Sequence, residues 1–281
     1  MSGMERALEQ HAVALIVRLL RERTGQVISA DRRWRIDRAI ETVLHKRGIA
    51  RSADIISLLT HPDSLAVEQE LVEALLNNET YFFRDRQVFA ELASAVIPAI
   101  CHAMGGNRQL RVWSVGCSTG QEPLSLAILM LEQGLRHRGW EVSILATDIS
   151  RSAIATARRG LYNRFEIQRG LTVNQMLRHF AETEHGWQAS AELLGMVRYE
   201  VGNLLDPPPP GPFDLILCRN LMLYFDDAAR RLACERLREA LAPHGRLLLG
   251  AGEAMLEAGS GFLPAARDFA LYRRVDRALA A

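Results

Sequence analysis

The sequence predicts an α/β fold in which an all-helical N-terminal domain precedes a mostly parallel β-sheet. Two observations support this prediction. Apolar residues recur at helical spacing through the first hundred residues, and short apolar runs alternate with helical stretches beyond Gly105 and Gly106. Strands that alternate with helices form βαβ units, whose sheets bind ligands at the carboxyl ends of the strands. We expect a helical domain at 1–77, a linker loop and connecting helix at 78–108, and the α/β domain at 109–281.

Four helices are predicted in the N-terminal domain, because apolar residues three and four positions apart would share one helix face. They occupy residues 4–23, 31–47, 52–60 and 64–76. Gly48 ends the second helix, since glycine readily takes the left-handed conformation that follows a helix. Pro62 separates the third helix from the fourth, because proline cannot continue a helix.

The α/β domain is predicted from strands and helices in alternation. Strands are expected at 111–115, 143–147, 213–218, 246–252 and 269–274, and helices at about 121–137, 150–159 and 226–241. The last strand belongs to an antiparallel, hairpin-like end.

One segment, at about 171–203, interrupts this alternation. It combines a helical piece at 173–182 with a hairpin-like stretch at 187–201. We interpret it as an insertion that forms a small β-subdomain.

Composition excludes several classes of protein. A net charge of +1 over 281 residues gives no polyelectrolyte character, so nucleic acid is not an expected partner. No apolar run approaches the roughly 20 residues of a membrane helix, and the N-terminus lacks a secretory pattern. The four cysteines lie far apart without C-x-x-C spacing. We expect a reduced, cytoplasmic, monomeric protein with no metal site and no membrane insertion.

The segment VWSVGCSTGQEP, residues 112–123, places a glycine-rich turn between a predicted strand and a helix. Such a turn leaves backbone N–H groups available and lets a ligand approach the chain closely. The spacing of Gly116 and Gly120 differs from the G-x-G-x-x-G of dinucleotide sites. Glu122 in the first helical turn would repel phosphate but suits an ammonium group or ribose hydroxyls.

Two further strand ends carry polar residues. Asp148 follows the strand at 143–147, where a carboxylate can accept hydrogen bonds from ribose hydroxyls. Asp148 could instead cap the next helix, a role that Ser150 also fits. Arg219 and Asn220 follow the strand FDLILC and are poor core material, so we expect them in the crevice above the sheet.

The glycine-rich turn also matches G-x-S-x-G, the nucleophile elbow of α/β-hydrolases, with Ser118 as the nucleophile. A hydrolase needs an acid and a histidine later in the chain. The candidates are His179, His185 and His244 with Asp148 or Asp226. None lies in a sequence context typical of a catalytic-histidine loop, and the hydrolase remains the alternative.

The stretch NNETYFFRD, residues 77–85, mixes three aromatic rings with several hydrogen-bonding groups. Its ordinary interpretation is a helix C-cap at Asn77 or Asn78 followed by core residues Phe82 and Phe83. Taken in order with VWSVGCSTGQEP, ATDIS, VGNLL and CRNLMLYF, the stretch resembles the chemotaxis receptor methyltransferase family (CheR). The resemblance covers nearly the whole chain.

The resemblance implies a Rossmann-like class I methyltransferase domain behind the helical domain. Members of the family transfer a methyl group from S-adenosyl-L-methionine to glutamate side chains in the cytoplasmic domain of methyl-accepting chemotaxis receptors, leaving S-adenosyl-L-homocysteine. The insertion resembles a small β-subdomain that docks a receptor C-terminal peptide in some members. Gln121 stands where many members have an acidic residue, so Glu122 carries that role alone.

The resemblance also implies the site residues. Arg84 and Tyr224 match the family's catalytic residues nearest the transferring methyl group, and NNETYFFRD would form a polar-aromatic lid. The expected cofactor contacts are Asn78, Thr80, Arg84, Gly116, Glu122, Asp148, Asn203, Leu204, Arg219 and Asn220. Asn203 and Leu204 would flank the adenine.

The predicted helix at 31–47 carries a basic stripe on one flank of its apolar face. The stripe consists of Arg32, Arg35, Arg38 and Lys46. It suits an acidic receptor helix, and a solvated helix face is the ordinary alternative. Two other functions fit the same fold: a methyltransferase with another acceptor, and a non-catalytic cofactor-binding regulator.

Overall fold

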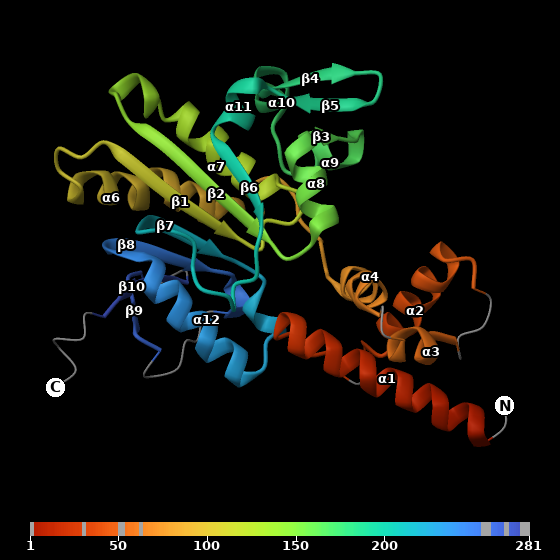
Figure 1. Cartoon of the computed structure of the whole chain (residues 1–281). Helices are drawn as coiled ribbons and strands as arrows, with labels where there is room; N and C mark the ends of the chain where they lie inside the picture. Colours follow the sequence, from red (N-terminus) through yellow and green to blue (C-terminus); the bar gives the residue numbers. More distant parts are fainter. Residues whose placement is uncertain are drawn as a thin grey trace. The chain divides into compact units, whose positions relative to one another are not determined.

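The chain forms two compact units, each with its own cluster of buried apolar side chains (Figure 1). The computed structural model describes residues 3–29, 32–49, 54–61, 64–253, 260–266 and 270–275. The first unit combines residues 1–77 with residues 224–230. The second combines residues 78–223 with residues 231–281.

The first unit is helical. Its helices are α1 (Gly3–Thr24), α2 (Trp34–Lys46), α3 (Asp54–Thr60) and α4 (Leu65–Leu75). Leu20, Ile40 and Leu71 are buried in its core, as their spacing predicts. The predicted helices match the observed ones, with ends that differ by at most three residues.

A short segment from late in the chain, residues 224–230, completes the helical unit. The Val27 N–H donates to the Tyr224 carbonyl oxygen at 2.8 Å. Arg21 Nε donates to the Asp226 carboxylate at 2.6 Å. The segment is therefore tied to the C-terminal end of α1 and to the residues that follow it.

The second unit is built on a seven-stranded sheet with the order β6-β2-β1-β7-β8-β10-β9. The first five strands in this order run parallel, and β10 runs antiparallel to its neighbours β8 and β9. This arrangement confirms the predicted sheet. The strands are β1 (Gln109–Val115), β2 (Glu141–Asp148), β6 (Val197–Val201), β7 (Phe213–Cys218), β8 (Leu241–Leu249), β9 (Phe262–Pro264) and β10 (Leu271–Arg274).

Helices cover this sheet (Figure 1). They are α5 (Arg86–Glu91), the π-helical turn η2 (Leu92–Val96), α6 (Ile97–Ala103), α7 (Gln121–Glu132), α8 (Arg151–Arg159) and α12 (Asp227–Ala240). Val112 and Leu215 from neighbouring strands share one apolar cluster with Leu92 and Leu124 from the helices. Their burial fixes which face of the sheet these helices pack against.

Two element boundaries differ from the predicted ones by five residues. The helix predicted to end at residue 137 ends at Glu132, because Gly134 takes a left-handed φ of 66° before a short 3₁₀ turn, η3 (Arg136–Arg138). Strand β8 begins at Leu241 rather than at residue 246. The first half of β8 contains Pro243 and Gly245, residue types that typically interrupt strands, so the sequence predicted a later start.

A small subdomain follows α8 and contains a three-stranded sheet with the order β3-β5-β4. Its elements are β3 (Leu161–Tyr162), α9 (Arg164–Gln168), α10 (Val173–His179), β4 (Phe180–Thr183), β5 (Gly186–Ala189) and α11 (Ala191–Gly195). The prediction of a hairpin within 187–201 is wrong: β4 pairs with β5, and β6 joins the main sheet beside β2. Alternating burial on β6 is equally consistent with either sheet, so its pattern could not reveal its partner.

None of the helices among the described residues combines the length and hydrophobicity of a membrane span.

His179, at the end of α10, gives the second unit a pH-dependent stability. Burial lowers the pKa of His179, whose Nε2 lies 3.9 Å from a Glu132 carboxylate oxygen. As pH falls below about 6.5, the unfolded chain binds a proton that the folded chain does not, so stability should decrease.

We expect this loss to be at most about 1.4 kcal/mol per pH unit. His179→Gln should flatten the dependence of the unfolding free energy between pH 7 and pH 5, measured by urea denaturation. Equal slopes for both proteins would contradict this assignment.

Candidate active site

The candidate site lies where the strand order of the sheet reverses. The chain continues from β1 to β2, which lies on one side of β1, whereas β7 lies on the other side of β1. The carboxyl ends of β1 and β7 therefore form a switch point of the kind that binds ligands. Thr147 of β2 and Cys218 of β7 are level with the last residue of β1. Gly116 and Arg219, which follow β1 and β7, and Asp148, the last residue of β2, therefore emerge at one edge.

The glycine-rich turn after β1 is held against β2. The N–H groups of Gly116 and Cys117 donate to the Thr147 carbonyl oxygen at 2.8 and 3.0 Å. Gly120 has φ +96°, and a Cβ there would lie 3.0 Å from the Tyr199 hydroxyl. The turn thus needs glycine both for its backbone conformation and for space.

Asp148 fixes the conformation of the same turn. Its two carboxylate oxygens accept hydrogen bonds from the N–H groups of Ser118 and Ser150, both at 2.8 Å. Ser150 caps α8 by accepting from the Ala153 N–H at 3.0 Å, which settles the choice of cap in favour of Ser150. Each carboxylate oxygen can accept more than one hydrogen bond, so a contact of Asp148 with ribose hydroxyls stays a prediction.

Arg219 ties three segments together. Its side chain is 1% exposed, and its Nη1 donates to Glu122 at 3.1 Å. Its Nη2 donates to the Arg84 carbonyl oxygen at 3.0 Å and forms an ion pair with Asp85. Glu122 also accepts from the Ser114 hydroxyl at 2.9 Å. The arginine with its two carboxylates carries a net charge of −1, which suits a cationic ligand.

Three of the five N–H groups of the Arg219 guanidinium make the hydrogen bonds named above. Its Nε is buried and has no hydrogen-bond partner among the described residues. A buried N–H without an acceptor costs about 1–3 kcal/mol.

The linker loop with Asn78, Thr80 and Arg84 belongs to the same unit. The Ser118 hydroxyl donates to the Asn78 carbonyl oxygen at 2.7 Å, which joins the loop to the glycine-rich turn. Arg84 Nη1 donates to the Glu79 carbonyl oxygen at 3.2 Å, and its guanidinium lies 5.6 Å from the centre of the Tyr81 ring.

The predicted C-cap and core residues of this loop have mixed outcomes. Phe82 and Phe83 are buried in the apolar cluster, as expected for core residues. The C-cap of α4 is Leu76, not an asparagine.

Strained backbone concentrates at this edge of the sheet. Among the described residues, the non-glycine residues with left-handed φ are Phe83, Asp85, Ser118 and Asn220, with values of 50 to 64°. Each such residue costs about 1–3 kcal/mol and persists only where its surroundings fix it. All four belong to the loops of the candidate site.

Asn203 and Leu204 follow β6, which is next to β2. The Gly202 N–H donates to the Asp148 carbonyl oxygen at 3.0 Å, so these residues emerge beside Asp148. Leu204 is buried, and Asn203 accepts from the Leu205 N–H at 3.1 Å.

Two site residues were missed by the sequence analysis. Asp85 pairs with Arg219, and Glu253 accepts hydrogen bonds from the loop that follows Arg219. Each is an isolated acid next to a residue or strand already singled out. That position was the only signal in the sequence.

Tyr224 belongs to the helical unit, whereas Arg84 belongs to the α/β unit. The Tyr224 hydroxyl accepts a hydrogen bond from the Asn77 amide at 2.8 Å. A joint role of Tyr224 and Arg84 therefore stays a prediction.

The basic stripe on α2 divides into two parts. Arg35 donates to the Leu75 carbonyl oxygen, and Lys46 pairs with Glu70 at 2.8 Å, so both are engaged by α4. Arg32 and Arg38 are exposed. Trp34, one turn before Arg38 on the same face, is 58% exposed.

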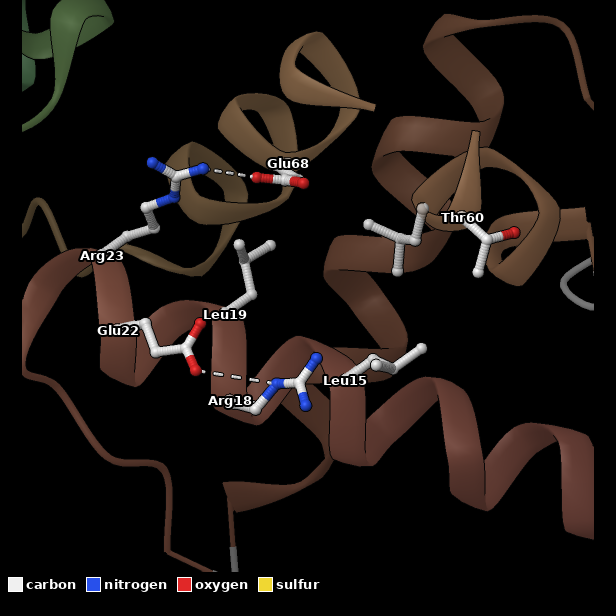
Figure 2. A pocket seen from close by; sticks show the side chains of 8 residues that line it. Leu15, Arg18, Leu19, Glu22, Arg23, Thr60 and Glu68 are labelled. Atoms are coloured by element: carbon white, nitrogen blue, oxygen red, sulfur yellow. Dashed lines mark hydrogen bonds and ion pairs between the residues drawn. The ribbon is translucent and has the colours of Figure 1, made fainter. Parts of the chain in front are cut away.

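A cavity of about 460 Å³ lies in the helical unit, between α1, α3 and α4 (Figure 2). Its charged rim consists of two ion pairs, Arg18 with Glu22 at 3.7 Å and Arg23 with Glu68 at 2.7 Å. None of the predicted site residues lines it.

The histidines that a hydrolase would require are engaged elsewhere. His179 lies near Glu132, His185 near Glu184, and His244 lies 2.8 Å from Asp214. Ser118, in turn, uses its hydroxyl to hold Asn78. Within the part of the chain that the structure describes, no three His, Cys, Asp or Glu residues are grouped to bind a metal.

Comparison with known proteins decides the family. Residues 78–265 match the family model described as "CheR methyltransferase, SAM binding domain". The chain belongs to the CheR methyltransferase family. It is therefore a SAM-dependent methyltransferase whose cofactor is S-adenosyl-L-methionine (SAM).

Several bacterial methyltransferases are similar over most of the chain. Chemotaxis protein methyltransferase 1 of Pseudomonas aeruginosa is 32% identical over 85% of this chain and 89% of its own length. The chemotaxis protein methyltransferase of Vibrio parahaemolyticus is 30% identical over 85% and 87%. The probable biofilm formation methyltransferase WspC of P. aeruginosa is 34% identical over 88% of this chain, but over only 58% of its own length.

We expect Asp148→Asn to weaken cofactor binding by this CheR protein about tenfold or more, because an amide has only one acceptor oxygen for the two N–H groups and for the ribose predicted to bind there. Isothermal calorimetry with S-adenosyl-L-homocysteine (SAH) would measure the change.

Ser150→Ala is the matched control. It removes the cap of α8, which costs about 1 kcal/mol of stability, without touching the carboxylate. The same small change in SAH affinity for both variants would contradict a role of Asp148 in cofactor binding.

Proposed function

We propose that this CheR protein is a protein-glutamate O-methyltransferase. It transfers a methyl group from SAM to glutamate carboxylates in the cytoplasmic domain of methyl-accepting chemotaxis receptors, giving glutamyl methyl esters and SAH. The observation that carries the proposal is that the Arg219–Glu122 ion pair and the Asp148 carboxylate emerge at one sheet edge, in a chain that is 32% identical to a chemotaxis protein methyltransferase. The protein would act in the cytoplasm as a monomer.

The residues at the sheet edge fit SAM in charge and in hydrogen bonding. Arg219 would lie beside the methionine part, and Asp148 would accept from the ribose hydroxyls. Glu122 and Asp85 would leave the site negative enough for a sulfonium. The remaining assigned contacts are Asn78, Thr80, Arg84, Gly116, Asn203, Leu204 and Asn220.

SAM would supply a methyl group on a positively charged sulfur. The acceptor carboxylate would attack the methyl carbon from the side opposite the sulfur, which leaves as the sulfur of SAH. The acceptor glutamate is already ionised near neutral pH, because its ordinary pKa is about 4.3. No general base is needed, so the chain contributes alignment and exclusion of water. Arg84 would steer the incoming carboxylate, and the Tyr224 hydroxyl would orient it.

Helix α2 would receive the acidic receptor helix. Arg38 and Arg32 are exposed, and Arg35 and Lys46 also hold α4. The similarity to WspC favours a second candidate acceptor, a receptor of an array that serves a response other than chemotaxis. The small subdomain would be the site of any receptor C-terminal peptide.

Incubation with tritiated SAM and a receptor cytoplasmic domain should give a base-labile label, as a carboxyl ester requires. Arg84→Ala should reduce the rate about 100-fold, since loss of alignment alone can cost that much. Arg86→Ala is the matched control, because Arg86 donates to the Gly170 carbonyl oxygen at 2.8 Å and has no assigned role in the reaction. Near-normal turnover of a folded Arg84→Ala protein would remove Arg84 from the mechanism.

Arg38→Glu should raise the KM for the receptor about tenfold and leave kcat unchanged, because it removes an attraction present equally before and during the reaction. The effect should shrink at high salt. Arg159→Glu makes the same charge change on α8 and should have little effect. An unchanged KM for Arg38→Glu would reject docking on α2.

A further inference from the structure

Glu253 is a buried carboxylate for which the proposed reaction has no use. It closes the short turn η5 (Ala251–Glu253) after β8 and is 8% exposed. Glu253 Oε2 accepts from the Asn220 N–H at 2.7 Å and from the Gly250 N–H at 2.9 Å. Glu253 Oε1 accepts from the Leu223 N–H at 3.2 Å. The side chain thus connects the end of β8 to the loop that follows β7.

That loop needs an external acceptor. Asn220 has a left-handed φ of 60°, a conformation that a non-glycine residue holds only when its surroundings fix it. Asn220 directly follows Arg219, whose guanidinium meets Glu122 and Asp85. A shift in the Asn220 backbone would therefore move the Arg219 side chain within its network.

The space around Glu253 is filled by the same loop. A Cβ on Gly250 would lie 2.7 Å from Glu253 Oε2 and 3.0 Å from the Asn220 nitrogen. Glycine at position 250 is what lets the carboxylate reach both backbone groups. The hydrogen bonds of the Glu253 carboxylate therefore depend on glycine at position 250.

We propose that Glu253 is a positioning residue for the cofactor site: it fixes the backbone at residues 220–223 and so sets Arg219 and Asn220 for binding of SAM. The inference rests on the proposed placement of the cofactor at this edge of the sheet. A carboxylate is required, because three N–H donors converge on one side chain and only an ionised acid presents two acceptor oxygens without a donor.

Glu253→Gln keeps the size of the side chain and replaces one acceptor oxygen by an NH₂ group. We expect the Kd for SAH, measured by calorimetry on the full chain, to rise about tenfold or more, since small misplacements of binding groups are costly. Amide hydrogen exchange over residues 218–224 should accelerate about tenfold, as loss of one hydrogen bond implies.

Asp214→Asn is the matched control for a merely structural role. Asp214 is also a buried carboxylate, 5% exposed, and it accepts from the Arg111 N–H at 2.7 Å on the same sheet. It lies at the start of β7, whereas the site follows the end of that strand. Asp214→Asn should lower the Tm while leaving the SAH affinity and the exchange of residues 218–224 unchanged.

Gly250→Ala provides a second variant that retains the acid. The added methyl group would push the carboxylate away from Asn220, so we expect the same rise in Kd and in exchange as for Glu253→Gln. If Glu253→Gln fails to fold, Gly250→Ala decides the question. An unchanged SAH affinity in a folded variant, or equal losses in Asp214→Asn, would overturn the inference.

These outcomes separate the inference from the proposed function. Failure of the unaltered protein to bind SAH would contradict the placement of the cofactor itself. Normal binding by the unaltered protein and by both variants would contradict only the role of Glu253.

Discussion

The candidate site depends on one buried guanidinium. Burying a charge costs several kcal/mol unless it is paired and hydrogen-bonded, and Arg219 meets this condition by joining Glu122 of α7, Asp85 and the Arg84 carbonyl oxygen. The linker loop, the glycine-rich turn and the loop after β7 are therefore not independent. Each segment forms part of the surroundings that the others need. Because the acids outnumber the base, the same network prepares a region that favours a cation, which is the charge of the donor in methyl transfer.

Strain and its compensation follow a single pattern at this edge. Three residues with left-handed φ each donate their backbone N–H to a side-chain acceptor: Phe83 to the Ser125 hydroxyl, Ser118 to Asp148, and Asn220 to Glu253. The acceptors come from α7, β2 and the turn after β8, which are supported by the core. The loops thus take unusual conformations because regular elements supply the missing hydrogen bonds. Such an arrangement orders a binding site before the ligand arrives.

The sequence predicts the sheet well, because buried parallel strands such as FDLILC are continuous apolar runs, and this one matches β7 residue for residue. It also predicts the polar residues that follow the strands, since topology alone brings strand ends together. Glu253 and Asp85 escaped prediction because their roles are contacts with backbone and with a distant arginine, which leave no periodic signal. The hairpin assigned to 187–201 failed for a related reason: periodicity shows that β6 is half-buried, but not which sheet it joins.

The segment 224–230 has a consequence for how the polypeptide is made. It follows β7 in the chain and includes the first turn of α12, yet it is part of the compact unit formed by the first 77 residues. During synthesis the N-terminal helices therefore leave the ribosome well before their last structural component is translated. Most of the sheet has to emerge in the meantime, so the two units cannot mature strictly one after the other. For the same reason, a fragment that ends at residue 77 would lack the segment 224–230 of its own compact unit, whatever its helical content.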